Sequence, residues 1–190
     1  MAAETTAYVD ESMRSLSRLY VLAAGFVVQS GEEDTVAALR RVLPGRAARF
    51  HWRHESEATR MRMVDAVREL GMHALAFCYQ ADHRRWAERG RVLAMRGLLW
   101  QLRVEGIRDL VLETRGRGND EHDRRTIAQA ERAGHASRGL RYRFSTPYAD
   151  PLLWIPDLLA GVIAHARAEG NDRYLLRLAE AAPTICMVEA

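Results

Sequence analysis

The feature that most constrains the fold is an apolar run near the start of the chain. Residues 20–28 are nine consecutive apolar or aromatic positions, one of them a glycine. Such a continuous run is typical of a strand that is buried on both faces of a sheet. A shorter strand-like run over residues 6–9 precedes it and ends at Asp10 and Glu11. Burying a carboxylate beside such a core is costly without a cation or a hydrogen-bond partner. The chain therefore predicts a central sheet with a cation site at one edge.

Alternating helical and strand-like patterns follow the two opening strands. We expect helices over residues 32–43, 55–70, 84–104, 120–133 and 156–168, strands over 73–80, 109–113 and 140–145, and an edge strand or loop over 49–52. This order indicates an α/β fold with a mixed sheet, antiparallel at the start and parallel later, and with helices on both faces. The 190 residues fit a single domain, in which residues 171–190 form a short C-terminal helix and tail.

Composition excludes several classes of protein. Apolar residues make up 48% and charged residues 28%, which is ordinary for a globular domain. No apolar run approaches the roughly 20 residues that span a bilayer, and the first residues show no secretory signal, so we expect a cytoplasmic protein without a membrane partner. Cys78 and Cys186 are too few for a disulfide framework or a cysteine zinc site. The apolar tail over residues 184–188 could pair with a second copy, as in a homodimer.

Three acidic residues occupy comparable places in the predicted elements. Asp10 ends the first strand, Glu113 ends the strand over residues 109–113, and Asp157 lies in the first turn of the last long helix. In an open sheet, strand ends and helix N-termini meet in one crevice, where ligands bind. Two carboxylates about 4 Å apart repel each other by roughly 4 kcal/mol at an effective dielectric near 20. A divalent cation removes that repulsion, and oxygen ligands suit Mg²⁺ or Mn²⁺.

The positions of Asp10, Glu113 and Asp157 predict a metal site, in which Glu11 is a candidate additional ligand. Two such ions could activate water and stabilise the leaving oxygen in phosphodiester cleavage. Each acid also has a simpler interpretation. Asp10 could accept hydrogen bonds in a turn, Glu113 could form an exposed ion pair with a nearby arginine, and Asp157 could only stabilise its helix N-terminus. Asp150 is a rival for the same role or a plain turn residue.

A glycine-rich basic loop follows Glu113 directly. Its Arg115 and Arg117 are candidates for contacts with a nucleic-acid backbone beside the metals. The alternative is an exposed loop that keeps the protein soluble.

A second cluster comprises His51, Arg53 and His54. His51 is a candidate proton shuttle at the carboxylate site, and Arg53 is a further candidate for nucleic-acid contact. The alternatives are ordinary helix capping and packing, a transition-metal site, or a histidine-dependent hydrolase centred on His51 and His54. A zinc protease would require His-Glu-x-x-His on a continuous helix, and the order of residues here is different.

Two short segments resemble a known family. Residues 8–12, Tyr-Val-Asp-Glu-Ser, precede an apolar strand, and residues 154–161 contain Asp157 at a helix start with Gly161 four residues later. Together with His51, these segments are similar to the uncharacterised family called domain of unknown function 3800 (DUF3800), over about residues 6–170. Met13 stands where the family usually has glycine, and Glu113 where many relatives have aspartate.

The resemblance implies a ribonuclease H-like fold that uses clustered carboxylates and two Mg²⁺ ions on nucleic acids. It also implies Asp10, Glu113 and Asp157 as metal ligands. We therefore predict a Mg²⁺- or Mn²⁺-dependent nuclease or phosphodiesterase whose partner is RNA or DNA. The alternatives are a catalytically silent interaction module of the same fold, associated with defence or mobile elements, and the histidine-dependent hydrolase.

Overall fold

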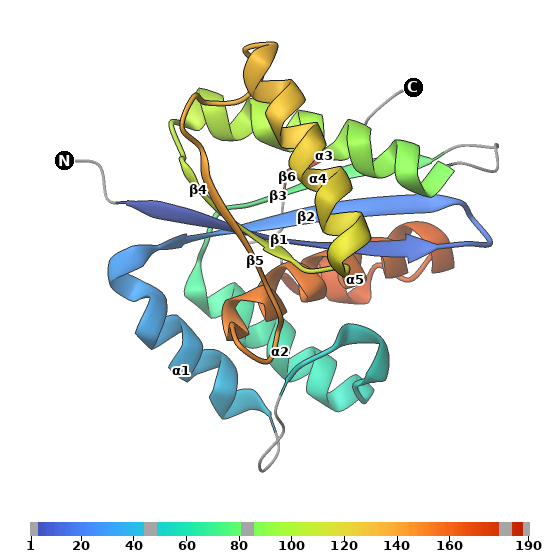
Figure 1. The fold of residues 1–190 in the computed structure, drawn as a ribbon. Coiled ribbons are helices and arrows are strands. Elements are labelled where there is room, and N and C mark those ends of the chain that lie inside the picture. The colour runs from blue at the N-terminus through green and yellow to red at the C-terminus, as the bar shows by residue number, and fades with distance from the viewer. Residues whose placement is uncertain (1–3, 44–48, 81–85, 179–183, 188–190) are drawn as a thin grey trace.

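A six-stranded mixed sheet forms the centre of the protein (Figure 1). The computed structural model describes residues 4–43, 49–80, 86–178 and 184–187. The strands follow the order β5-β4-β1-β2-β3-β6 across the sheet. Their bounds are Thr5–Arg14 for β1, Leu19–Val28 for β2, Ala74–Gln80 for β3, Asp109–Glu113 for β4, Arg141–Ser145 for β5 and Thr184–Met187 for β6.

The pairing directions agree with the predicted mixed sheet. β1 and β2 form an antiparallel hairpin, and β3 pairs with β2 in the same sense. β4 pairs with β1, and β5 with β4, in parallel. The apolar run predicted as a central strand is β2, of which every residue except Val28 is buried. The prediction of antiparallel opening strands followed by parallel ones is therefore confirmed.

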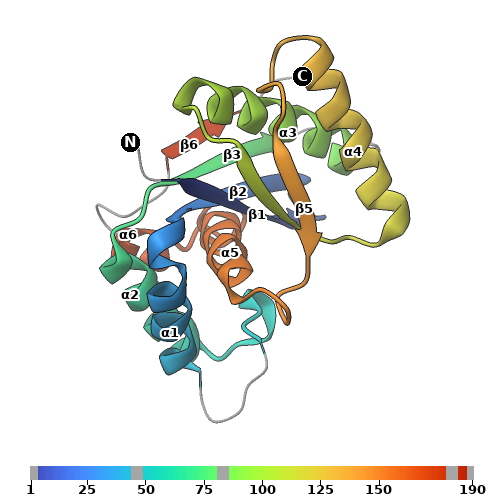
Figure 2. The same ribbon diagram turned by 60° about the vertical axis from the view of Figure 1, so that its left-hand side comes forward.

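Helices cover both faces of the sheet (Figure 2). The face that we call the α5 face packs against α1 (Glu32–Val42), α2 (Glu57–Leu70), α5 (Trp154–Glu169) and α6 (Arg173–Leu178). The opposite face, the α3–α4 face, packs against α3 (Trp86–Glu105) and α4 (Arg117–Arg132). Each face buries its own apolar cluster, so side chains of one strand divide between two cores.

Strand alternation decides where the acidic residues point. In β1, Tyr8 belongs to the cluster on the α5 face, whereas Ala7 and Val9 belong to the cluster on the α3–α4 face. Successive side chains of a strand point to opposite faces. Asp10 therefore lies on the α5 face and Glu11 on the α3–α4 face.

The loop after β4 is shorter than predicted. Helix α4 begins at Arg117 instead of residue 120, because Asp120 accepts hydrogen bonds from the Arg115 backbone N–H (2.8 Å) and the Thr114 hydroxyl (2.6 Å). Gly116 makes the turn into the helix with a φ of 88°, which a residue with a Cβ rarely adopts. Residues 114–116 thus form the predicted loop, whereas residues 117–120 belong to α4.

Two further segments refine the predictions. Residues 49–51 form a loop, which is one of the two predicted alternatives, and Trp52–His54 form a 3₁₀ turn. Residues 184–187 form β6, which pairs in parallel with β3 of the same chain. The tail predicted to pair with a second copy is thus engaged within its own chain, and residue 188 lies outside the described residues. Among the described residues, no helix combines the length and apolarity needed to cross a membrane.

Candidate functional site

The three predicted acids line one cleft at the C-terminal end of β4. Asp10, Glu113 and Asp157 surround a cavity of about 200 Å³, and His51 lies on the same wall. β1 and β4 are parallel with Val9 opposite Leu112, so the next residues of the two strands, Asp10 and Glu113, lie beside each other. Glu113 ends β4 as predicted, but β1 continues to Arg14, so Asp10 lies within its strand and not at the predicted strand end. The first turn of α5 brings Asp157 to this cleft from the α5 face. The structure therefore brings these side chains together, as the sequence predicts.

Asp10 carries the strongest electrostatic perturbation in the cleft. Asp10 is buried, with 8% of its surface exposed. Burial raises the pKa of Asp10 well above its usual range, and the nearby carboxylates of Glu11, Glu113 and Asp157 raise it further. Burial and the charge of Asp157 also raise the pKa of Glu113, while a hydrogen bond with Asp10 lowers it. The crowding of these acids therefore opposes the ionisation of all of them at once.

Asp157 is held by the loop that precedes α2. Its Oδ2 accepts a hydrogen bond from the Trp52 backbone N–H at 2.8 Å, and His51 Nδ1 lies 3.3 Å from the same oxygen. The hydrogen bond to Asp157 raises the pKa of His51. His51 and Asp157 therefore form a pair in which the imidazole holds a proton more readily than a free histidine does.

Close packing fixes the Trp52 backbone. The side chain is buried against Gly161 of α5, where a Cβ would lie 2.2 Å from Trp52 Cγ. Arg60 Nε donates to the Trp52 carbonyl at 2.7 Å, and its guanidinium lies 5.1 Å from the centre of the indole ring. Sequence reasoning noted Gly161 only as part of a family resemblance, and it missed the Trp52 N–H as the partner of Asp157.

Glu11 is engaged on the other face of the sheet. Its Oε2 lies 2.6 Å from Nη1 of Arg91, and its Oε1 lies 3.7 Å from Nε of Arg115. These partners favour a counter-ion role for Glu11 over the predicted role of an additional metal ligand.

The buried guanidinium of Arg91 is the centre of this ion-pair network. Arg91 is 2% exposed and donates to both carboxylate oxygens of Asp123, at 3.1 and 2.6 Å, and to the Tyr20 hydroxyl at 3.1 Å. Arg115 Nη2 donates to the same Asp123 at 2.9 Å. Sequence reasoning missed Arg91 and Asp123, because charged residues inside predicted helices are ordinarily solvated and no spacing marked them as partners.

The predicted nucleic-acid contacts occupy three different environments. Arg115 lines the cleft but is largely buried in the ion-pair network. Arg117 is exposed at the start of α4 and is not among the residues that line the cleft. Arg53 is exposed, lines the cleft and donates to the Met13 backbone carbonyl. Of the three, Arg53 combines access to solvent with access to the site.

The remaining candidates have local roles. Asp150 accepts a hydrogen bond from the Leu152 N–H and pairs with Arg143 at 2.6 Å, so it serves the turn before α5. His54 stacks edge-on against His51, with ring centres 4.5 Å apart, but does not line the cleft.

The donor set of the cleft has the chemistry of a hard-cation site. Asp10, Glu113 and Asp157 offer carboxylate oxygens, which Mg²⁺ and Mn²⁺ prefer. Among the residues that the structure describes, however, no three His, Cys, Asp or Glu side chains are grouped closely enough to hold one ion together. The cleft thus fits a divalent cation by charge and donor type, without an assembled ligand cage.

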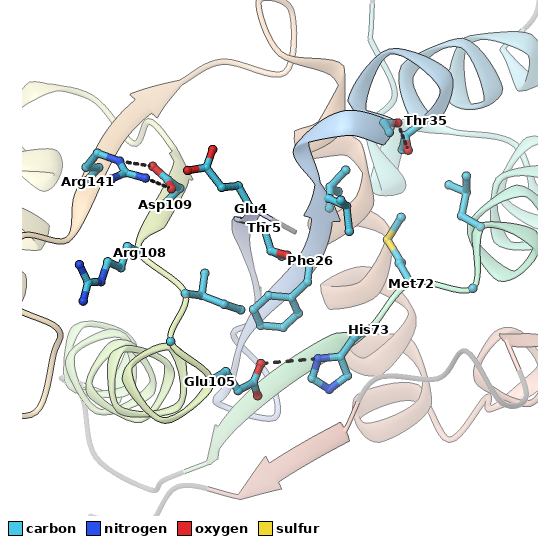
Figure 3. A pocket seen from close by; sticks show the side chains of 17 residues that line it. Glu4, Thr5, Phe26, Thr35, Met72, His73, Glu105, Arg108, Asp109 and Arg141 are labelled. Carbon is cyan, nitrogen blue, oxygen red and sulfur yellow. Dashed lines mark hydrogen bonds and ion pairs between the residues drawn. The ribbon is translucent and has the colours of Figure 1, made fainter. Parts of the chain in front are cut away.

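A larger cavity of about 800 Å³ lies elsewhere, at the opposite ends of β1 and β4 (Figure 3). Its charged side chains are largely paired with one another: Arg141 binds Asp109, and His73 lies 3.8 Å from Glu105. Phe26 stacks on His73 with ring centres 5.0 Å apart. None of the predicted site residues lines this cavity.

Comparisons with known proteins show the fold. No family model and no curated protein matches the sequence, so the resemblance to DUF3800 stays a prediction. Among solved structures, the chain is similar to a crystal structure of a mutant protein of Bst-RNase HIII, with a TM-score of 0.50 and 14% identity. The similarity covers 88% of this chain but only 56% of that one. At this identity the likeness concerns the fold alone, and it agrees with the predicted ribonuclease H-like α/β architecture.

Proposed function

We propose that the protein is a divalent-metal-dependent nuclease that hydrolyses phosphodiester bonds of RNA or DNA at the carboxylate cleft. The observation that carries this proposal is the convergence of Asp10, Glu113 and Asp157 on one cleft. Burial and the neighbouring carboxylates raise the pKa of Asp10 there. Strongly perturbed acids in a cleft are candidates for functional sites. The similarity in fold to a ribonuclease HIII protein supports the same class of substrate. We also propose that the protein is related to the DUF3800 family and that it is cytoplasmic.

Asp10, Glu113 and Asp157 are the residues that would hold Mg²⁺ or Mn²⁺ in this function. The bound metal would supply an activated water and charge stabilisation for the leaving oxygen. The chain itself contributes the orientation of the acids. The Trp52 N–H occupies one oxygen of Asp157, and the register of β1 against β4 sets Asp10 beside Glu113.

His51 is the proposed proton carrier. Its hydrogen bond to Asp157 raises its pKa, so the ring holds a proton closer to neutral pH than a free histidine. A histidine in this position can give that proton to a leaving oxygen, a role that typically contributes 10²–10⁴-fold to a rate. The side chain is partly exposed and lines the cleft.

A cleavage panel tests this function. Labelled single-stranded and duplex RNA and DNA, and an RNA–DNA hybrid, are incubated with Mg²⁺, Mn²⁺ or a chelator. We expect cleavage only with a divalent ion, and a loss of at least about 100-fold in Asp10→Asn and Glu113→Gln. Asp34→Asn is the matched control, because Asp34 is exposed on α1 and does not line the cleft.

Two other outcomes would favour the alternatives. Turnover that ignores divalent ions but is lost in His51→Gln would indicate a histidine-dependent hydrolase. A folded protein that cleaves none of the substrates and binds no divalent ion in calorimetry would indicate the silent interaction module, an alternative that the absence of a ligand cage among the described residues favours.

A further inference from the structure

A second groove opens beside the carboxylate cleft. Its volume is about 590 Å³, and it shares Met13, Trp52 and Arg53 with the cleft as common walls. The turn between β1 and β2 and the C-terminal half of α5 form its other sides. Its charged lining consists of Arg14, Arg53, Arg60, His165 and Glu169, so arginines outnumber the single acid. We call it the basic groove.

Strand β1 connects the cleft to the basic groove along one face. Asp10, Ser12 and Arg14 alternate along the strand, so all three point to the α5 face. Arg14 Nη1 donates to the Ser12 hydroxyl at 2.9 Å, and Arg14 Nε lies 3.3 Å from Glu169 of α5. Four residues of strand advance by roughly 13 Å. A carboxylate and a guanidinium thus stand on the same strand face, about that distance apart.

Neutral carbonyl groups orient the other two arginines of the groove. Arg53 donates to the Met13 carbonyl, and Arg60 donates to the carbonyls of Trp52 (2.7 Å) and Arg53 (3.3 Å). Within the described part of the chain, neither guanidinium forms an ion pair with a carboxylate. Their positive charges are therefore held in place without being neutralised.

The charges in the groove act on one another. Burial lowers the pKa of Arg14, the charges of Arg53 and Arg60 lower it further, and Glu169 opposes them. The pKa of His165 is lowered by burial and by surrounding arginines, against the opposing effect of Glu169. Positive charge is thus in excess here, next to a cleft that is lined by carboxyl groups. An anionic substrate would be repelled by the cleft alone and needs a cationic contact beside it.

We propose that the basic groove binds the phosphodiester backbone of a nucleic-acid strand, with Arg14 and Arg53 contacting phosphates. Guanidinium groups present paired N–H donors that match phosphate oxygens. Leu16, fully exposed at the tip of the β1–β2 turn, supplies an apolar surface for a base or sugar. This inference rests on the proposed function for one statement, that the bound strand continues into the carboxylate cleft.

Binding without cleavage tests the groove separately from the catalytic proposal. Fluorescence anisotropy measures the affinity of labelled single-stranded and duplex oligonucleotides for the Asp10→Asn protein in chelator, at several salt concentrations. The double variant Arg14→Gln with Arg53→Gln removes two charges and keeps hydrogen-bonding side chains. Arg89→Gln with Arg125→Gln is the matched control, with the same change in net charge at exposed positions of α3 and α4.

We expect the groove variant to bind at least about tenfold more weakly than the control variant. Each phosphate contact contributes about 0.7 to the slope of log affinity against log salt for a single strand, so losing two contacts reduces the slope by about 1.4. Glu169→Gln is expected to bind more tightly than the Asp10→Asn protein alone, because it removes the opposing charge. A purely structural groove would not produce that gain.

Each other outcome has a defined meaning. Equal affinity and equal slope in the groove and control variants would overturn the proposal. Inorganic phosphate is also tested for displacement of the oligonucleotide. If it bound as tightly as the oligonucleotide does, the groove would be a site for a small anion, and the proposal would be overturned. Binding that follows the prediction while the wild type cleaves no nucleic acid would keep the groove and reject the nuclease. The same two arginine substitutions are also made in the protein that keeps Asp10. Cleavage by that variant with Mg²⁺ at unchanged KM would reject the groove and keep the nuclease.

Discussion

The backbone N–H of Trp52 donates a hydrogen bond to Asp157 Oδ2, although the two residues are 105 positions apart in the chain. The contact joins the loop before α2 to the first turn of α5. It places the last of the three cleft acids relative to Asp10 and Glu113, which come from the sheet. The geometry of the cleft therefore depends on how closely the Trp52 indole packs against α5.

Gly161→Ala is expected to unfold more easily and to lose activity. The added Cβ would lie 2.2 to 2.6 Å from three atoms of the buried Trp52 ring. Overpacking of this kind costs about 1–3 kcal/mol, which outweighs the gain of up to about 1 kcal/mol from placing alanine in a helix. Urea unfolding measures the change in stability, and the cleavage panel measures the displacement of Asp157.

Gly118→Ala is the matched control for this substitution. Gly118 also lies in a helix, α4, but a Cβ there would meet no atom within 4 Å. It should be neutral or stabilising. A Gly161→Ala protein as stable as the Gly118→Ala protein would show that the Trp52 packing is not tight.

Asp10→Asn is expected to stabilise the protein when no divalent ion is present. The pKa of Asp10 is higher in the folded protein than in the unfolded chain, so the folded state holds the proton more strongly. The free energy of unfolding therefore falls as pH rises from about 4 through the raised pKa. Asparagine never ionises, and its amide can still donate to Glu113. Its melting temperature in chelator should exceed that of the wild type at pH 7, by about 2–4 °C for each kcal/mol of relieved repulsion.

The same comparison at acidic pH provides the check. Below about pH 4 Asp10 is protonated in both states, so the difference between the two proteins should disappear. Asp34→Asn, an exposed residue of α1, should show no comparable pH-dependent gain. A lower melting temperature for Asp10→Asn at pH 7 in chelator would contradict the electrostatic description of the cleft.

Mg²⁺ or Mn²⁺ is expected to raise the melting temperature of the wild type. A ligand that binds only the folded state adds about 2.7 kcal/mol at 100 times its Kd, which corresponds to about 5–11 °C for a chain of this size. Asp10→Asn and Glu113→Gln should lose this shift, and Asp34→Asn should keep it. KCl at matched ionic strength controls for screening, and an equal shift with KCl would count against a specific metal site.

Arg91→Met is expected to destabilise the protein strongly. The substitution leaves Glu11 and Asp123 largely buried without their main cation, since Arg91 binds the first at 2.6 Å and the second through two nitrogens. Removing one partner of a buried ion pair typically costs 3–5 kcal/mol. Arg96→Met, an exposed position of the same helix, should stay within about 0.5 kcal/mol. Similar urea midpoints for the two variants would mean that Arg115 alone neutralises both acids.

Local patterns were sufficient to predict most of the secondary structure. Buried residues recur along the chain with the repeat of the strand or helix that they form. The apolar run therefore predicted β2, and the periodic apolar positions predicted α2 and α5. The placement of Glu113 at the end of β4 and of Asp157 in the first turn of α5 was predictable for the same reason. The prediction that Asp10 ends its strand was wrong, because pairing with β2 extends β1 to Arg14.

Long-range partners were not predictable in this way. Arg91 and Asp123 look like solvated helix residues in the sequence, and only the packing of α3 against α4 buries them together. Arg115 was predicted as a nucleic-acid contact in a loop. In the structure Asp120 binds the Arg115 backbone N–H, and the Arg115 side chain enters the same network. The pairing of β6 with β3 likewise depends on the path of the chain around the sheet.

Asp10 and Glu11 illustrate the division most clearly. Their order in the chain already requires that two successive strand residues point to opposite faces. Strand order and the helices that cover each side decide that Asp10 meets Glu113 and Asp157, whereas Glu11 meets Arg91. Backbone geometry depends on residues that are adjacent in the chain, so the local sequence predicts it. The partners of a charge are chosen by packing between segments far apart in the chain, so they emerge only when the fold is complete.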